Sequence, residues 1–251
     1  MKFLVQKIGG KIVYDFAFEL IQAQSYYKWR KDKIEIKYTN LTVPDGIKNA
    51  HKYIPVGSVE FVSEFIEKYL PESIDALRPL NVPECLFPFA GRLIVNVKQP
   101  SDMGLFNSGY VFAKSNTVLK DESNGLVQTK CHQPEYFIGK QVSDMVPDIC
   151  SEWRVFVHNN EIQHIANYSG NCTEFPSISA IKSMVKAYEK DSPIAYTLDV
   201  GVTENHKTIV VECHRFFSCG LYGFCDYAKL PIMFSQEWFE IKQMAIKKEG
   251  M

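Results

Sequence analysis

Apolar positions along the first 70 residues recur with the two periods that distinguish helices from strands. Residues 2–5 and 33–38 have the short apolar or alternating patterns of strands, and residues 15–24 carry apolar side chains at helical spacing. The clearest helix spans 58–70, and its apolar stripe comprises Phe61, Val62, Phe65, Ile66, Tyr69 and Leu70. Pro71 follows this helix, as proline often does. The chain therefore begins with a mixed α/β region.

A proline-rich stretch follows this region. Five of the twelve prolines lie between residues 71 and 100. Proline fixes φ and removes a backbone donor, so such a stretch is a poor helix and a poor central strand. We therefore predict a boundary here, with an N-terminal α/β domain over 1–90 and a second domain over 91–251.

Hairpins dominate the pattern beyond the boundary. The three expected hairpins pair residues 93–98 with 110–113, 153–158 with 161–168, and 195–202 with 208–213. Two helices are also expected, over 179–190 and 237–248, and the second reads as exposed.

Composition excludes several classes of protein. The chain has 251 residues with 46% hydrophobic and 13% aromatic content, which excludes a disordered chain. Its net charge of −1 argues against a dedicated nucleic-acid scaffold, which needs a large basic excess. No apolar run is long enough to span a bilayer, and the first residues turn polar too early for a signal peptide. The seven cysteines form no Cys-x-x-Cys pair, so we expect a soluble cytoplasmic protein.

The last hairpin places acidic side chains on one face. If Val202 pairs with Ile209, then Asp199 faces Glu212, and His214 follows on the same side of the sheet. Directly opposed Cβ atoms lie about 5 Å apart, so two carboxylates there repel unless a positive charge lies between them. A hard divalent cation is the usual solution. The alternative is a solvated polar face, with His214 as an ordinary hydrogen-bonded residue.

Two further patterns suggest anion binding. Glu152 and Arg154 share one strand face, and the planar fork of arginine suits a phosphate or carboxylate, although a surface ion pair of little energy has the same pattern. Lys98 ends a strand ahead of the Gly-containing loop 104–109, which is compatible with a phosphate site but does not match a Walker A sequence. Most lysines at strand ends are instead simply exposed to solvent.

In their order along the chain, these patterns resemble an ATP-grasp protein. The resemblance is strongest to the clade named for an arginine and two lysines, which occurs in bacteria and phages, and it covers about residues 93–226. The matching segments are YIPVGSVEFV (53–62), SEWRVFV (151–157), LDVGV (198–202), VECH (211–214) and GLYG (220–223). The resemblance implies an α+β fold in which two antiparallel-sheet lobes, 91–150 and 151–251, clamp ATP behind a small α/β domain.

The resemblance also assigns roles to individual residues. It implies Lys98 and Arg154 as catalytic residues, with Lys98 on the ATP phosphates and Arg154 on the transferring phosphate or acyl phosphate. Asp199, Glu212 and His214 occupy the metal positions. The implied nucleotide-binding residues are Lys98, the hinge residues Ser143, Asp144, Met145 and Val146, and Glu152 near the ribose or phosphates.

The chemistry implied by the family is carboxylate activation. We expect an ATP- and Mg²⁺-dependent ligase, with Mn²⁺ as an alternative ion, that joins a carboxylate to an amine or thiol through an acyl phosphate. A peptide or an amino acid is the expected substrate. No membrane partner and no clear nucleic-acid patch are expected, and the oligomeric state is open, a homodimer being one option.

Two departures from the family pattern keep other functions open. His214 stands where the family has a metal-binding Asn, and Gly104 stands where its second lysine is usual; Lys114 or Lys130 could supply the missing charge. The alternative is therefore a catalytically impaired nucleotide-binding protein used for recognition or regulation. A metal-dependent hydrolase using Asp199, Glu212 and His214 is a third possibility, though it has no obvious general base.

Overall fold

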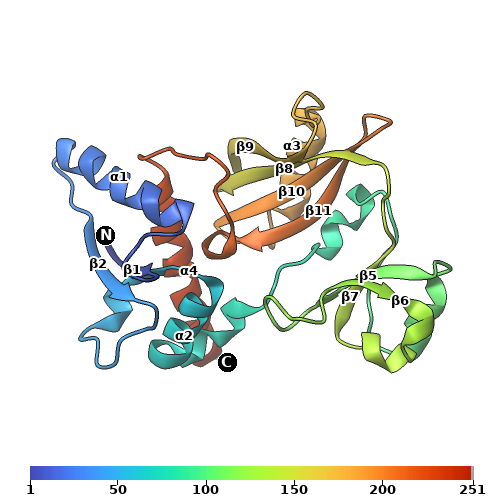
Figure 1. Ribbon diagram of the computed structural model, residues 1–251, viewed down its shortest axis with the longest axis horizontal. Coiled ribbons are helices and arrows are strands. Elements are labelled where there is room, and N and C mark those ends of the chain that lie inside the picture. Colours follow the sequence, from blue (N-terminus) through green and yellow to red (C-terminus); the bar gives the residue numbers. More distant parts are fainter. Residues whose placement is uncertain (250–251) are drawn as a thin grey trace. The chain divides into compact units, whose positions relative to one another are not determined.

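The computed structural model describes residues 1–249, which form two compact units (Figure 1). The first unit contains Met1–Leu77, Pro193–Tyr196 and residues 215–249. The second contains Arg78–Ser192 and Thr197–His214. No helix of the described residues combines the length and the hydropathy that crossing a membrane requires. The domain ranges expected from the sequence stay a prediction.

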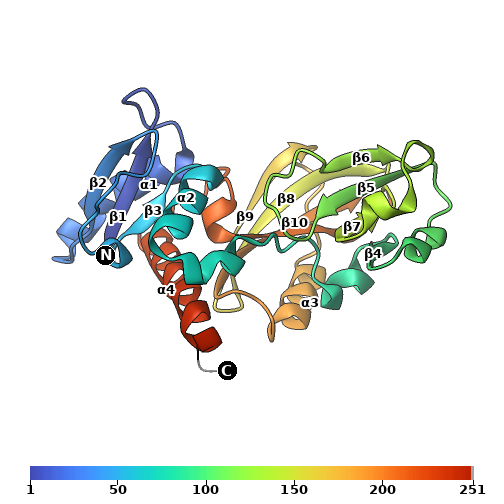
Figure 2. The same ribbon diagram turned by 90° about the horizontal axis from the view of Figure 1, so that it is seen from below.

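The first unit is built on a parallel three-stranded sheet with the order β2-β1-β3. Its strands are β1 (Lys2–Lys7), β2 (Glu35–Asn40) and β3 (Ile54–Val56), and its helices are α1 (Asp15–Trp29), α2 (Val59–Tyr69) and α4 (Leu230–Glu249). Figure 2 shows α2 and α4 beside β3, and α4 also packs against α1. The predicted α/β character of the N-terminal region is confirmed.

The helix α2 begins where its sequence provides a cap. The hydroxyl of Ser58 accepts a hydrogen bond from the Phe61 backbone N–H at 3.1 Å, which satisfies one of the free donors of the first turn. The predicted apolar stripe is buried through Phe61, Val62, Phe65 and Ile66. Capping and periodicity agree here, and the predicted helix is confirmed.

The prediction of an exposed C-terminal helix over 237–248 is wrong. The helix α4 begins at Leu230, and one of its faces is buried through Leu230, Met233, Phe234, Trp238 and Ile241. The sequence window that began at residue 237 left out the first two apolar turns, and the rest of the helix is polar enough to read as exposed.

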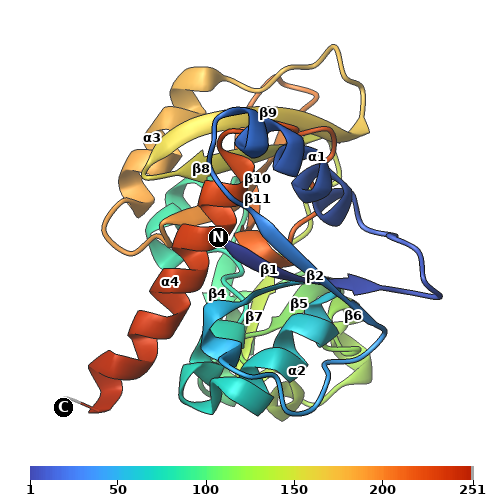
Figure 3. The ribbon, with the colours of Figure 1, turned by 90° about the vertical axis from the view of Figure 1, so that its left-hand side faces the viewer.

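The second unit contains two four-stranded antiparallel sheets (Figure 1). The first has the order β4-β7-β5-β6, with β4 (Ile94–Asn96), β5 (Tyr110–Ser115), β6 (Gly125–Gln128) and β7 (Lys140–Ser143). The second has the order β11-β10-β8-β9, with β8 (Ile149–His158), β9 (Glu161–Gly170), β10 (Ala195–Thr203) and β11 (Thr208–Arg215). The helix α3 (Ile178–Tyr188) covers the side of the second sheet that faces away from the first (Figure 3).

The structure corrects one of the three predicted hairpins. The strands at 93–98 and 110–113 are not partners, because β7 lies between β4 and β5, and β5 instead forms a hairpin with β6. Alternation shows which face a residue occupies but not which strand lies beside it. The β8–β9 and β10–β11 hairpins are confirmed.

The proline-rich stretch contributes short 3-10 helices rather than α-helix or strand. Such helices are brief and tolerate proline near their start. The 3-10 helices of this stretch are η2 (Pro71–Leu77), η3 (Glu84–Phe89) and η4 (Pro100–Leu105). Others lie elsewhere in the chain: η1 (Ala50–Lys52), η5 (Thr129–Cys131), η6 (Pro134–Phe137) and η7 (Phe216–Ser218).

Residues 78–92, which precede β4, tie the two sheets of the second unit together. The carbonyl of Asn81 accepts from the Cys213 N–H of β11 at 2.7 Å, and its side-chain amide donates to the Ser115 carbonyl of β5 at 2.9 Å. The guanidinium of Arg92 donates to the carbonyls of Val210 and Val211 at 2.8 and 3.0 Å. The hydrogen bonds of Asn81 hold one end of β5 near β11, and those of Arg92 attach the same segment to β11.

A buried carboxyl group anchors the start of η7 in the first unit. The two oxygens of Glu237, on α4, accept hydrogen bonds from the Phe216 and Phe217 backbone N–H groups at 2.9 and 2.8 Å. Burial raises the pKa of Glu237 to about 8, against the opposing effect of Arg215 and of these two hydrogen bonds.

We predict that this carboxyl group makes stability fall as pH rises. Between its ordinary pKa of 4.5 and about 8, the unfolded chain has lost the proton that the folded chain keeps, so each step up in pH favours unfolding. Glu237→Gln lacks this titration and serves as the reference. Urea denaturation at pH 5, 6.5 and 8 should show the stability of the wild type falling relative to the variant. A difference that is constant with pH would contradict the assignment.

Candidate functional site

Three side chains of the β10–β11 hairpin form a compact cluster. Asp199, Glu212 and His214 each offer a ligand atom, and these atoms lie within 4.8 Å of one another. The Nε2 atom of His214 is 2.9 Å from Glu212 Oε1 and 3.6 Å from Asp199 Oδ2. The expected gathering of these side chains on one face is confirmed, while their role as metal ligands stays a prediction.

A buried ion pair joins the cluster to the neighbouring strand. Arg154 of β8 donates through Nε to Asp199 Oδ1 at 2.8 Å and through a terminal nitrogen to Oδ2 at 2.7 Å. The two side chains are 8% and 1% exposed. Burial by itself raises the pKa of Asp199, but the two hydrogen bonds from Arg154, together with the nearby imidazole of His214, outweigh it and hold the pKa below its usual value. Asp199 is therefore ionised.

Lys114 reaches the cluster from the other sheet of the same unit. It lies on β5 and forms an ion pair with Glu212 Oε2, and its ammonium group lies 5.5 Å from the centre of the Phe112 ring. Burial lowers the pKa of Lys114 to about 8, although Asp199 acts in the opposite direction. The cluster and its ion-pair partners thus bring together two carboxylates and two cations drawn from both sheets.

From the sequence, Lys114 was only one of two residues that could supply the charge of the family's second lysine. The other, Lys130, lies exposed in η5. The alternation of β5 does place Phe112 and Lys114 on one face of the strand. That pattern does not show that this face lies against the sheet that carries Glu212.

Glu152 lies beside Arg154, as their spacing predicted. The hydroxyl of Tyr168, on β9, donates to Glu152 Oε2 at 2.5 Å, and the Arg154 guanidinium lies 5.7 Å from the centre of the same ring. Burial, followed by the charges of Asp199 and Glu152, raises the pKa of Tyr168, which therefore stays a donor. The part of Glu152 in nucleotide binding stays a prediction.

The residues expected to form a hinge connect the two sheets. Ser143 is the buried last residue of β7, and the backbone N–H of Asp144 donates to the Leu93 carbonyl at 3.0 Å. Met145, 49% exposed, and Val146 follow on the way to β8. The position of the segment as the connection is confirmed, and its contact with adenine stays a prediction.

Lys98 does not share the hydrogen bonds and ion pairs of the cluster among the described residues. It follows β4 and is exposed, and its backbone N–H donates to the carboxylate of Asp102 at 2.8 Å. Within residues 1–249, its ammonium group forms no ion pair with the three cluster side chains. Gly104, which occupies the place of the family's second lysine, is also exposed.

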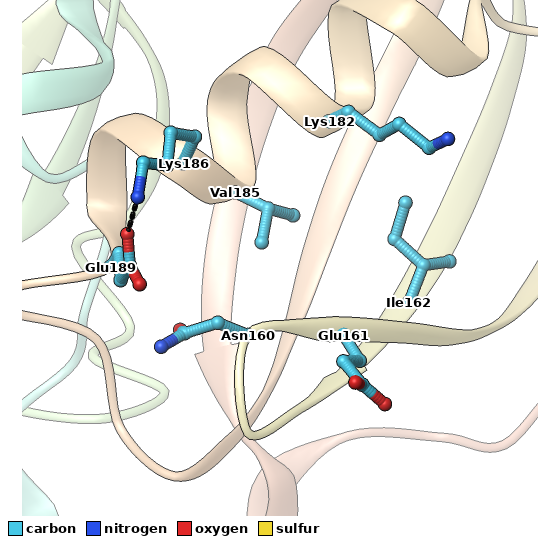
Figure 4. Close-up of a pocket in the computed structure, with 7 residues that line it drawn as sticks. All are labelled: Asn160, Glu161, Ile162, Lys182, Val185, Lys186 and Glu189. Carbon is cyan, nitrogen blue, oxygen red and sulfur yellow. Dashed lines mark hydrogen bonds and ion pairs between the residues drawn. The ribbon is translucent and has the colours of Figure 1, made fainter.

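A separate hollow of about 400 Å³ lies between α3 and the start of β9 (Figure 4). Val185 points from the helix toward the hairpin, while Lys186 turns to pair with Glu189. The remaining lining residues are Asn160, Glu161, Ile162 and Lys182. None of them belongs to the cluster of Asp199, Glu212 and His214, so the hollow is distinct from the candidate site.

The sequence model of one protein family matches residues 96–230, and it is described as an ATP-grasp domain of R2K clade family 2. This range contains the whole cluster, the hinge and Lys98. No curated protein sequence is significantly similar to the chain.

Solved structures of ATP-grasp ligases share the fold. The ligase PsnB, complexed with a minimal precursor, gives a TM-score of 0.51 at 10% identity, covering 94% of this chain and 98% of that one. The D-alanine–D-alanine ligase from Bacillus anthracis gives 0.51 at 12% identity, covering 97% and 99%. The N5-carboxyaminoimidazole synthetase from Staphylococcus aureus gives 0.51 at 12%, covering 85% and 69%. The predicted α+β ATP-grasp fold is confirmed.

We predict that Arg154→Met destabilises the protein by about 3–5 kcal/mol, because it leaves the Asp199 carboxylate buried without its cation. Lys186→Met is the matched control, since it breaks a pair with Glu189 whose side chains are 80% and 42% exposed. The control should change stability by less than about 0.5 kcal/mol. Urea denaturation measures the free energy of unfolding of both variants. Equal losses would show that the buried pair contributes no more to stability than the exposed pair does.

Proposed function

The chain belongs to R2K clade family 2 of the ATP-grasp domains, and on that premise we propose that it is an ATP- and Mg²⁺-dependent ligase. It would activate a carboxylate as an acyl phosphate and transfer the acyl group to an amine or a thiol. The observation that carries the proposal is the meeting of Arg154, Lys114 and the acidic cluster from facing sheets in one unit. Phosphoryl transfer requires such positioned charge.

The residues of the cluster fit a divalent metal ion. Asp199 and Glu212 supply carboxylate oxygens, and the Nε2 atom of His214 is buried without an aligned hydrogen bond although oxygen atoms lie nearby. A nitrogen that is removed from water and has no hydrogen bond is an expensive arrangement unless it receives another partner. Asp199, Glu212 and His214 would therefore hold the ion, which when bound would neutralise phosphate charge.

Arg154 and Lys114 would bind the phosphate oxygens. Both cations already lie in a partly dry site, where their interactions with an anion are stronger than in water. Each is balanced by a carboxylate, so the cluster is close to neutral until an anionic ligand arrives. Arg154 would then stabilise the acyl phosphate through its planar fork, and Lys114 would stabilise a phosphate as a point charge.

The nucleotide would be positioned by the connection between the sheets. Ser143, Asp144, Met145 and Val146 would offer backbone groups to adenine, and Glu152 would lie near the ribose or the phosphates. Lys98 would provide a further phosphate contact. The location of the hinge between the sheets supports this arrangement.

The substrate is proposed to be a peptide or an amino acid. Support comes from two relatives of similar fold, one described as a ligase complexed with a minimal precursor and the other as a D-alanine–D-alanine ligase. Residues 1–90 would take part in choosing the carboxylate and the amine.

The alternative is a nucleotide-binding protein without turnover. Gly104 and His214, the two departures from the family pattern, favour it. Lys114 weakens it, because this residue supplies a second cation at the cluster. ATP binding measured by calorimetry is expected under both functions, whereas phosphate release on addition of an amino-acid or peptide library is expected only of the ligase. Absence of ATP binding would refute both.

We predict that Glu212→Gln lowers phosphate release by about 100-fold or more while the protein stays folded. The variant removes the charge of Glu212, which is the proposed metal ligand and also the partner of Lys114. Glu212 is 21% exposed and tolerates the change better than Asp199, whose replacement takes a buried carboxylate away from Arg154. Glu189→Gln is the control and should retain full activity. Normal turnover in Glu212→Gln would remove Glu212 from the site.

A pair of lysine variants separates the two candidate phosphate contacts. Lys114→Met should weaken ATP binding by about tenfold, the effect of losing roughly 1.4 kcal/mol of charge interaction. Lys98→Met should have the smaller effect, because Lys98 is exposed and has no ion pair at the cluster. Calorimetry with ATP and Mg²⁺ measures both. A larger loss in Lys98→Met would reverse the assignment.

A further inference from the structure

The hydrogen bonding of His214 differs from that of the other cluster residues. Asp199 accepts two aligned hydrogen bonds from Arg154, and Glu212 is paired with Lys114. The Nε2 atom of His214 is buried and has no aligned hydrogen bond, although Glu212 Oε1 is only 2.9 Å away. The imidazole therefore approaches two carboxylates without the geometry of a hydrogen bond.

The separations within the cluster are those of neighbouring metal ligands. Ligands about 2.1 Å from an ion lie about 3.0 Å apart at a right angle and about 3.4 Å apart at the tetrahedral angle. The Nε2 atom of His214 lies 2.9 Å from Glu212 Oε1 and 3.6 Å from Asp199 Oδ2. One ion could contact all three side chains after small movements.

The carboxylates retain the capacity to bind an ion beside their cations. Lys114 engages Oε2 of Glu212, which leaves Oε1 directed toward His214. Each oxygen of Asp199 accepts one hydrogen bond from Arg154, and a carboxylate oxygen has two lone pairs. The ligand set available to an ion is therefore two oxygens and one imidazole nitrogen.

This mixed ligand set determines which ions bind well. Mg²⁺ strongly prefers oxygen ligands, whereas imidazole suits divalent ions of the first transition series. For such ions, affinity at a given site generally rises from Mn²⁺ through Fe²⁺ and Co²⁺. Mn²⁺ is therefore a conservative probe, because a preference found with it sets a lower limit for the others.

We propose that His214 makes this site select a divalent transition-metal ion over Mg²⁺. The inference rests on the proposed metal site and deepens it, since it names the class of ion that the ligase would use. It concerns the ion that is bound and not whether turnover occurs.

The test uses the full chain with a non-hydrolysable ATP analogue. Mn²⁺ binding is followed by electron paramagnetic resonance, with Mg²⁺ as competitor, and the bound Mn²⁺ is examined for spin-echo modulation from a directly coordinated ¹⁴N nucleus. Wild type should show this modulation and a preference for Mn²⁺ over Mg²⁺. His214→Asn, which offers an oxygen instead, should lose the modulation and reduce the preference by about tenfold or more.

A second histidine provides the matched control. His206 lies 2.9 Å from Glu174 through Nδ1, but its side chain is 75% exposed, and it is outside the cluster. His206→Asn should leave the modulation and the preference unchanged. His214→Gln, checked for folding by circular dichroism, replaces His214→Asn if the latter does not fold.

Three results would overturn the inference: equal preference in wild type and the His214 variant, no ¹⁴N modulation in the wild type, or no Mn²⁺ binding by the folded wild type. Phosphate release with Mg²⁺ is measured separately. Phosphate release by a wild type that shows any of these three results refutes this inference and leaves the ligase proposal intact. Absence of ATP binding refutes the ligase, while ¹⁴N modulation without nucleotide would still support selection by His214.

Discussion

The ion pair between Arg154 and Asp199 is the constraint that orders the rest of the candidate site. Two charges that are 8% and 1% exposed are tolerable only when each satisfies the other, and here the guanidinium meets both carboxylate oxygens. The pair fixes β8 beside β10 with their polar positions on the same face. Glu152 and Tyr168 then complete the surroundings of Arg154, and Glu212 and His214 those of Asp199.

Charge balance extends this constraint across the two sheets of the unit. A second acid beside Asp199 would repel it, and Lys114 of β5 supplies the compensating charge to Glu212. The hydrogen bonds of Asn81, which join β5 to β11, support that contact. A site made this way is neutral overall but rich in local charge, which is the arrangement that phosphoryl transfer needs.

The departures from the family pattern have different structural consequences. Gly104 lies exposed and away from the interactions of the cluster, where Lys114 is paired with Glu212. His214 lies within the cluster and changes its ligand chemistry from oxygen to nitrogen. The first departure therefore lies outside the cluster, whereas the second lies within it and is the residue proposed to select the bound ion.

The sequence by itself determined which residues share a face. Alternation placed Glu212 with His214 and Glu152 with Arg154, and the assumed pairing of Val202 with Ile209 brought Asp199 to the same face. Helical spacing determined α2. Tertiary structure decided the partners: β7 between β4 and β5, the buried face of α4, and the contact of Lys114 with Glu212. The physical reason is that periodicity is a local property of the backbone, whereas partners depend on contacts between residues far apart in the chain, such as Lys114 and Glu212, which no local pattern records.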